Sequence, residues 1–358
     1  MTEIDQRRLT LSARLPELKI DALLVSAPAN VRYLTGYAGS NGVLLLTKAD
    51  AHFFTDPRYA IEASQQITCK VHVEKKPLFL AASALIKRKR LKKIGFESSA
   101  LRFEDYLKIK EELPLGSGLH PISRIVEEQR MVKSASEITL IRQSVATNSE
   151  AYSKTIRRVH AGAREQDIAA ELDYQMRRLG AEKATFETIV ACGIRSALPH
   201  AHPTHHRLGE NELLLIDMGA SQEGYASDMT RVAHSGVPPK RIQRMYKAVL
   251  EAQLAAISAV SAGVTTGAVD AAARNVLKRH ELDRAFVHST GHGLGLEIHE
   301  PPRIARKDKT KLQAGMAITI EPGAYIDGLG GIRIEDTVLV TEHGCEVLTP
   351  TPKDFIEL

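Results

Sequence analysis

The chain has 358 residues, 43% of them hydrophobic and 25% charged, with a formal net charge of +5, which is ordinary for a globular protein of two domains. No apolar run approaches the length of a membrane span, and the charged segment 1–15 lacks the apolar core of a secretory signal. The three scattered cysteines (Cys69, Cys192 and Cys345) argue against a disulfide framework and predict a reducing, cytoplasmic setting.

The first third of the chain alternates predicted strands and helices. We predict strands over 21–26, 42–47, 51–55, 70–74 and 93–97, and helices over 57–66, 78–90 and 102–112. This order is typical of a small α/β domain. A stretch with Pro114, Gly116, Gly118 and Pro121 then indicates a break, so we place an N-terminal α/β domain at residues 1–124.

A basic run, Lys87-Arg88-Lys89-Arg90 followed by Lys92-Lys93, ends the helix predicted over 78–90. Such a run can bind nucleic acid or a membrane surface. It has no interleaved aromatic residues and no nucleic-acid motif accompanies it, so we interpret it as a solvated helix end. We therefore predict neither a nucleic-acid partner nor a membrane partner.

Residues 125–358 are predicted to form an α+β domain. Ser136 is predicted to cap a helix that reaches about Val159, and further helices are predicted over 163–179, 239–261 and 266–282. Strands that carry acidic residues alternate with these helices. We therefore predict helices outside a curved, mostly antiparallel sheet.

Five residues of this domain are chemically unusual, since four carboxylates and one imidazole stand beside glycine or inside apolar runs. Unpaired buried carboxylates are costly, so such a cluster needs positive charge. Oxygen-rich ligands with one histidine suit Mn, Co or Zn, and surplus carboxylates indicate two ions that share bridging ligands, as in metal-assisted hydrolysis. The residues are Asp217 in LLLIDMGA, Asp228 in YASDMTR, His292 in STGHGLGLEIHE, Glu321 in ITIEPGAY and Glu335 in GIRIEDT.

Two predicted hairpins bring the carboxylates together. If the first hairpin turns between Gln222 and Glu223, Asp217 and Asp228 are direct cross-strand neighbours. Glu321 and Glu335 flank the glycine-rich turn 327–331, and their even spacing keeps both on one face of a simple strand pair. A bulge would shift either register.

These motifs, in this order, resemble the creatinase and aminopeptidase P superfamily of pita-bread metallopeptidases. The nearest members are the Xaa-Pro aminopeptidases and the Xaa-Pro dipeptidases, or prolidases. The N-terminal segments NVRYLTGYAGSNG and FTDPRY also look like those of small bacterial aminopeptidase P-like proteins. The resemblance implies a pita-bread catalytic domain at residues 125–358, a proline-containing peptide as substrate and a homodimer.

The resemblance also implies a role for each of the five residues. Asp217 resembles the residue that chelates the first metal, Asp228 and Glu335 the two bridging carboxylates, and His292 and Glu321 the other ligands of the second metal. The implied cofactor is two divalent ions, most often manganese, with cobalt or zinc also used.

Further residues match positions outside the ligand set. His200, in SALPHAHP, resembles the residue that contacts the scissile amide or leaving group. His299 resembles the residue that hydrogen-bonds the tetrahedral intermediate, and His288 resembles one that lines the proline pocket. Arg333, two residues before Glu335, is predicted to orient the carboxylates from the same face of its strand.

Two functions remain open. An Xaa-Pro aminopeptidase tolerates residues after the proline, whereas a dipeptidase must recognise the proline carboxylate, usually with an arginine. The candidate arginines are Arg32 and Arg58, both expected in N-terminal loops. We favour the aminopeptidase. Of the other classes, a non-catalytic pita-bread binding protein and a metal-free creatinase-like hydrolase would both lack the acidic set, which is intact here.

Overall fold

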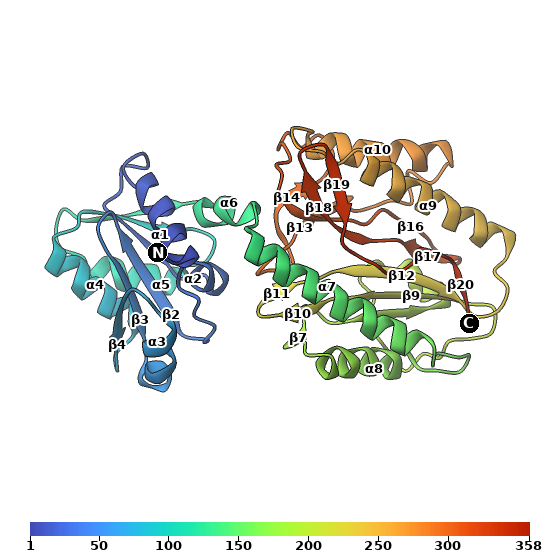
Figure 1. Cartoon of the computed structure of the whole chain (residues 1–358), viewed down its shortest axis with the longest axis horizontal. Helices are drawn as coiled ribbons and strands as arrows, with labels where there is room; N and C mark the ends of the chain where they lie inside the picture. The colour runs from blue at the N-terminus through green and yellow to red at the C-terminus, as the bar shows by residue number, and fades with distance from the viewer. The chain divides into compact units, whose positions relative to one another are not determined.

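The computed structural model describes residues 1–358, which form two compact units, Met1–Arg130 and Met131–Leu358 (Figure 1). The predicted boundary between residues 124 and 125 lies one helix earlier, before α6 (Ile125–Met131). This helix belongs largely to the first unit, because Arg130 Nη1 donates to Asn30 Oδ1 (2.6 Å) and Glu127 Oε1 accepts from Asn30 Nδ2 (2.8 Å). No helix in the chain has both the length and the apolarity that a membrane crossing requires.

The first unit is built on a six-stranded mixed sheet of order β4-β3-β2-β1-β5-β6. Its strands are β1 (Ala22–Val25), β2 (Gly42–Thr47), β3 (Ala51–Thr55), β4 (Lys70–Val73), β5 (Lys93–Glu97) and β6 (Gly118–Ile122). Its helices are α1 (Glu3–Arg14), α2 (Pro28–Thr35), η1 (Pro57–Tyr59), α3 (Ala60–Gln66), α4 (Leu78–Lys89) and α5 (Phe103–Glu112). The predicted α/β class is confirmed.

Two elements of this unit were not predicted. Strand β6 occupies the stretch interpreted as a break, and it is an edge strand, where Pro121 can be accommodated. Helix α2 replaces a predicted loop. Pro28 stands in its first turn and Gly36, in the left-handed conformation, ends it, which is the usual asymmetry of helix termini. Arg32 therefore lies in a helix, and the prediction that it lies in a loop was wrong.

The second unit combines four helices with short, mostly antiparallel strands, as predicted. The sheet orders are β11-β10-β7, β20-β12-β9-β8, β14-β13-β15-β18-β19 and β16-β17, and only β12 and β20 pair in parallel. The helices are α7 (Ala135–Ile156), α8 (Glu165–Arg178), α9 (Lys240–Ser258) and α10 (Thr266–Arg279), with a 3-10 turn η2 (Gly193–Ala197). The strands are β7 (Lys183–Ala184), β8 (Ile189–Cys192), β9 (Leu213–Met218), β10 (Ala220–Gln222), β11 (Tyr225–Ala226), β12 (Met229–His234), β13 (Gly291–Gly293), β14 (Glu300–Ile304), β15 (Ala317–Ile320), β16 (Gly323–Ile326), β17 (Gly330–Arg333), β18 (Asp336–Thr341), β19 (Gly344–Val347) and β20 (Ile356–Glu357).

The N-terminus of α7 differs from the prediction. Ser134, rather than Ser136, is the capping residue, because its hydroxyl accepts from the Glu137 N–H while the Glu137 carboxylate accepts from the Ser134 N–H. This reciprocal pair is a capping box, which satisfies two backbone donors at once. The helix consequently begins at Ala135.

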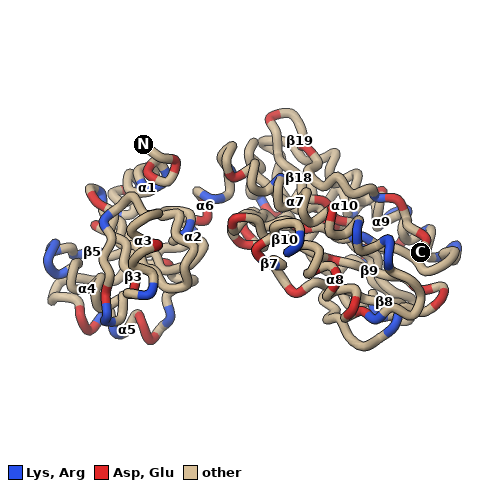
Figure 2. The backbone as a smooth tube through the Cα atoms, turned by 60° about the horizontal axis from the view of Figure 1, so that its bottom comes forward, with Lys and Arg blue, Asp and Glu red and all other residues tan.

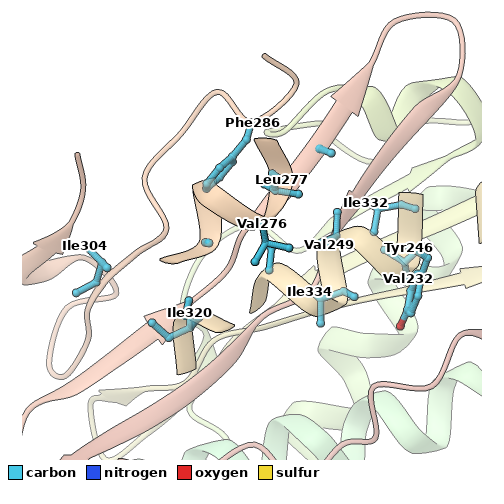
Figure 3. Close-up of a cluster of buried hydrophobic side chains, with 14 of the residues drawn as sticks. Val232, Tyr246, Val249, Val276, Leu277, Phe286, Ile304, Ile320, Ile332 and Ile334 are labelled. Carbon is cyan, nitrogen blue, oxygen red and sulfur yellow. The ribbon is translucent and has the colours of Figure 1, made fainter. Parts of the chain in front are cut away.

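The strands of the second unit lie between two pairs of helices, and the alternating side chains of β9 pack against both pairs. Leu214 and Ile216 pack with α7 and α8, whereas Leu213 and Leu215 pack with α9 and α10. Successive side chains of a strand point to opposite faces, so Asp217 falls on the α9–α10 side. Figure 3 shows the core on that side, where helix residues such as Val249 and Val276 lie near strand residues such as Ile320.

Charged residues of both signs are interspersed over each unit (Figure 2). The basic run at the end of α4 follows this pattern, since Lys87 pairs with Glu112 (2.9 Å) and Lys89 with Asp50 (2.8 Å). Exposed pairs of this kind contribute little to stability. The run is therefore a helix end with acidic partners, in agreement with its interpretation from the sequence.

Candidate metal centre

The register of the first hairpin differs from the prediction. The turn lies on Glu223 and Gly224, which both have positive φ, so Asp217 pairs with Thr230 instead of Asp228. Asp228 lies two residues before Thr230, just outside β12, and the even offset keeps it on the side of Asp217. Gly219 allows the segment after β9 to approach the segment before β12 closely, since a Cβ at residue 219 would stand 2.3 Å from the Ser227 carbonyl oxygen.

The second hairpin has the predicted register. Strands β15 and β18 pair with Ile320 opposite Asp336, and β16 and β17 pair with Gly323 opposite Arg333. The two pairings share one register, so Glu321 and Glu335 stand opposite each other. They lie in the short gap between the pair β15–β18 and the pair β16–β17. A hydrogen bond from the Ile334 N–H to the Pro322 carbonyl spans the same gap (3.4 Å).

The five predicted ligand residues include a compact group. Atoms of Asp228, His292 and Glu335 that can bind a metal all lie within 4.8 Å of one another. His292 Nε2 is 3.5 Å from Asp228 Oδ2 and 3.4 Å from Glu321 Oε1. Ligands about 2.1 Å from a shared ion stand roughly 3–4 Å apart, so these spacings fit a bound cation.

The tautomer of His292 also fits metal binding. Its Nδ1 lies 3.0 Å from the Gly293 carbonyl oxygen, which can only accept a hydrogen bond. Nδ1 therefore carries the proton, and the lone pair of Nε2 faces the carboxylates. A backbone acceptor of this kind commonly fixes the orientation of a metal-binding histidine.

The carboxylates are short of donors. Asp228 and Glu335 are 5% and 1% exposed, and Asp217 Oδ1, Asp228 Oδ1 and Glu335 Oε1 are buried without a hydrogen-bond partner. Burial, and next the charge of Asp217, raises the pKa of Asp228 well above its usual value. Burial, and next the charge of Asp228, likewise raises the pKa of Glu335. Buried acceptors without donors are rare in folded proteins, and a cation would satisfy all three.

Arg333 supplies part of the missing positive charge. It is 3% exposed, its Nη2 lies 2.5 Å from Asp217 Oδ2, and its Nε donates to Thr230 Oγ1 (3.0 Å). The same hydroxyl donates to Glu335 Oε2 (2.7 Å). Arg333 therefore contacts one carboxylate directly and reaches another through Thr230, although one guanidinium cannot neutralise four carboxylates.

Tyr325 is a site residue that the sequence did not reveal. Arg333 Nη1 donates to Tyr325 Oη (2.6 Å), and Tyr325 Oη lies 2.9 Å from His288 Nε2. His288 Nδ1 faces the Ser289 carbonyl (2.8 Å) and so carries the proton, which leaves Nε2 to accept from Tyr325. The only available signal was the register, because Tyr325 lies two residues from Gly323, the partner of Arg333.

The remaining predicted histidines lie around this cluster. The His299 ring contacts the His292 ring edge-on, with centroids 4.4 Å apart. His200 follows Pro199, whose carbonyl oxygen accepts from Arg333 Nη1 (3.3 Å), and a positive charge on His200 would lower the pKa of both His288 and His299. Burial, and next the charge of Arg333, lowers the pKa of His288 to about 4. Both His200 and His299 are exposed, as residues that meet a substrate must be.

The two predicted carboxylate-binding arginines lie in the first unit. Arg32 is in α2, and Arg58 is in η1, where its guanidinium donates to both oxygens of Asp56 (3.0 and 2.9 Å). A role for either in binding substrate remains a prediction. The pairing of Arg58 with Asp56 makes it a weaker candidate for binding a second carboxylate.

Comparison with known proteins assigns both units to families. Residues 139–342 match metallopeptidase family M24, and residues 7–132 match the creatinase/prolidase N-terminal domain. The chain belongs to metallopeptidase family M24. The Xaa-Pro dipeptidase of Pyrococcus furiosus is 36% identical over 345 residues, which are 95% of this chain and 96% of that protein.

Solved structures show that this M24 chain has the prolidase-type pita-bread fold that was predicted. An Xaa-Pro dipeptidase from Bacillus anthracis matches with a TM-score of 0.97 at 35% identity, covering 99% of this chain and 100% of that one. An X-Pro aminopeptidase from Thermotoga maritima matches with a TM-score of 0.90 at 34% identity, covering 96% and 100%. The family is one of metal-dependent hydrolases, and its divalent cations fit the carboxylate cluster described above.

Proposed function

We propose that this M24 chain is an exopeptidase with two metal ions that hydrolyses the bond between an N-terminal residue and proline. One observation carries the proposal: Asp228 and Glu335, each with a buried carboxylate oxygen that has no donor, lie with His292 in a group whose metal-binding atoms are within 4.8 Å of one another. Such a cluster is costly unless cations occupy it. The names of the similar proteins support the Xaa-Pro bond as the target.

The ligand residues have distinct places in this proposal. Asp217 would hold the first ion, His292 and Glu321 the second, and Asp228 and Glu335 would bridge the two. Two divalent cations, manganese first among the candidates, would lower the pKa of an attacking water and stabilise negative charge on the scissile carbonyl. Arg333 would keep Asp217 oriented toward the first ion throughout.

The surrounding histidines would act on the substrate. His299 is exposed beside His292 and would donate to the carbonyl oxygen as negative charge develops there. Burial lowers the pKa of His299. His200 would contact the scissile amide, and His288 would line the proline pocket with its ring, since both of its nitrogens already have partners.

The preferred length of the peptide substrate distinguishes two candidate enzymes, an aminopeptidase and a dipeptidase. We favour an enzyme that tolerates residues after proline, because Arg58 is already bound to Asp56 and so is poorly placed to bind a substrate carboxylate. A strict dipeptidase is the second candidate, favoured by its similarity to the Xaa-Pro dipeptidases of Pyrococcus furiosus and Bacillus anthracis. A cytoplasmic homodimer completes the proposal, and the three free cysteines fit a reducing compartment.

The test compares kcat/KM for Ala-Pro and Ala-Pro-Ala with added manganese. Cleavage of the bond before proline, abolished by exhaustive chelation and restored by Mn or Co, is the expected result. Full turnover in a verified metal-free sample would contradict the role of metal ions. A strong preference for Ala-Pro, lost on neutralising Arg32 or Arg58, would assign the chain as a dipeptidase instead.

A further inference from the structure

The loop that carries His200 connects β8 to β9, and we call residues 193–204 the His200 loop. Its middle is attached to β17, where Ser196 Oγ accepts from the Gly331 N–H (2.8 Å). Nearby, the Pro199 carbonyl accepts from Arg333 Nη1 (3.3 Å). These contacts hold the loop at one point, but they do not fix its two ends.

Both ends of the His200 loop are bound by one carboxylate, that of Glu165, the first residue of α8. Glu165 is 0% exposed. Its Oε1 accepts from the Cys192 N–H (2.8 Å) and from Arg195 Nε (3.0 Å), and its Oε2 accepts from the Thr204 N–H (2.9 Å) and Thr204 Oγ1 (2.7 Å). Cys192 precedes the loop and Thr204 ends it, so this side chain joins the two ends of the loop. The Gln166 N–H, on the same helix, also donates to the Thr204 carbonyl oxygen (3.2 Å).

The bonding pattern of Glu165 requires a carboxylate. Four donors point at two oxygens that only accept, and two of the four are the backbone N–H and the hydroxyl of Thr204, at the end of the loop. A glutamine amide would turn an N–H₂ group toward at least one of these donors and leave it unpaired. Bonds to a buried ionised group are stronger than neutral ones, and an unpaired buried donor is costly.

Arg195 extends this attachment across the loop. Besides its bond to Glu165, its Nη2 donates to the His202 carbonyl oxygen (2.9 Å). The backbone on both sides of His200 is therefore tied, directly or through Arg195, to a residue at the start of α8. His200 itself remains exposed.

We propose that Glu165 is a positioning residue, which acts on the reaction by holding His200 against the scissile amide. The proposal rests on the Xaa-Pro peptidase function proposed above. Glu165 belongs to no metal ligand set and does not touch the ion site. Its loss should therefore misplace His200 and leave metal binding intact.

The first test measures hydrogen exchange in the metal-loaded holoenzyme. Glu165→Gln, and the milder Thr204→Val, should speed exchange over 193–204, while exchange in β12, β15 and β18 is unchanged. Asp167→Asn is the matched control, because Asp167 lies on the same helix but pairs only with exposed Arg164 on the surface. Unchanged exchange over 193–204 in both Glu165→Gln and Thr204→Val would overturn the proposal, even if the wild type cleaves no Xaa-Pro bond.

The second test is a double-mutant cycle with His200→Ala. Misplacing a substrate-contacting group typically costs about 10- to 100-fold in kcat/KM, so Glu165→Gln should lose that much at unchanged metal stoichiometry. In the His200→Ala background, the same substitution should cost little, because its target is gone. Additive losses would show that Glu165 acts independently of His200 and overturn the link. A wild type without Xaa-Pro activity would refute the proposed function alone.

Discussion

At the scale of single residues, Arg333 donates hydrogen bonds to three side chains within the site. It contacts the Asp217 carboxylate, the Thr230 hydroxyl and the Tyr325 hydroxyl. Burial disfavours its charge, but Tyr325 and the surrounding carboxylates outweigh that effect and raise its pKa well above the usual value. Only a planar, forked cation can bond to all three at once.

Arg333→Lys should therefore weaken metal binding although it conserves the charge. A lysine ammonium is a compact charge that cannot hold Asp217 and Tyr325 in their present geometry. Loss of such an orienting partner typically lowers metal affinity about 10- to 100-fold. Calorimetric titration of the chelated protein with Mn measures the change. Arg241→Lys, at an exposed position of α9, serves as the control, and equal affinities in the two variants would contradict the orienting role of Arg333.

His299→Ala tests the residue proposed to stabilise charge that develops during the reaction. The substitution should lower kcat about 10²- to 10³-fold with little change in KM, because the lost interaction forms only in the transition state. Steady-state kinetics at verified metal stoichiometry measure this split. His202→Ala is the control, since that exposed histidine pairs with Glu187 and should have no effect. A near wild-type kcat in His299→Ala would remove His299 from the mechanism.

At the scale of elements, glycines decide how closely the site strands approach one another. A Cβ on Gly291 would lie 1.9 Å from the Thr319 carbonyl oxygen, and one on Gly293 would lie 2.3 Å from the Pro301 carbonyl oxygen. Backbone atoms cannot move aside to relieve such a clash as easily as the end of a flexible side chain can. The two glycines on either side of His292 therefore let β13 lie close to β15 and β14.

Gly291→Ala should consequently disturb both stability and metal binding. The strands must separate to admit the methyl group, and overpacking typically costs about 1–3 kcal/mol. His292 would move with β13, so metal affinity should fall as well. Urea unfolding and a Mn titration measure the two effects. Gly118→Ala, where the nearest atom is a side-chain nitrogen at 3.6 Å, is the control and should leave both unchanged.

The two hairpins show what the sequence could and could not predict. One aspartate and three glycines within residues 327–331 marked the second turn clearly, and the placement of Glu321 and Glu335 on one face followed from it. The first turn needs positive φ at two residues, and Glu223 adopts it without being a glycine. No sequence signal placed the turn on Glu223, so the predicted pairing of Asp217 was wrong. Asp228 nonetheless lies on the side of Asp217, because it is two residues from Thr230, the actual partner of Asp217.

The missed elements have equally local causes. Helix α2 has proline at its start and glycine after its end, but in a segment of only eight residues the same two residues also mark a turn. Tyr325 could not be recognised because a tyrosine in an apolar strand is usually part of the core. Its two hydrogen bonds depend on strand pairing and on the approach of His288, which comes from a distant segment.

At the scale of the whole molecule, metal binding should contribute to stability. Folding without cations buries several carboxylates beside one another, whereas a bound cation removes that cost. Ligand that binds only the folded state adds about 2.7 kcal/mol when its free concentration is roughly 100 times Kd. Thermal unfolding of Mn-loaded and chelated protein, followed by circular dichroism, measures the difference. Equal thermal unfolding midpoints for the two samples would show that bound metal does not stabilise the carboxylate cluster.

The placement of α9 and α10 between the two hairpins has a consequence for the order of folding. Asp217 and Asp228 lie before these helices, and His292, Glu321 and Glu335 lie after them. Contacts between distant parts of a chain form slowly. The meeting of the two hairpins closes a long segment that contains both helices, so we expect it to follow the formation of α9 and α10. Uptake of Mn should accordingly lag behind the recovery of helical signal, which makes metal capture a late marker of native assembly.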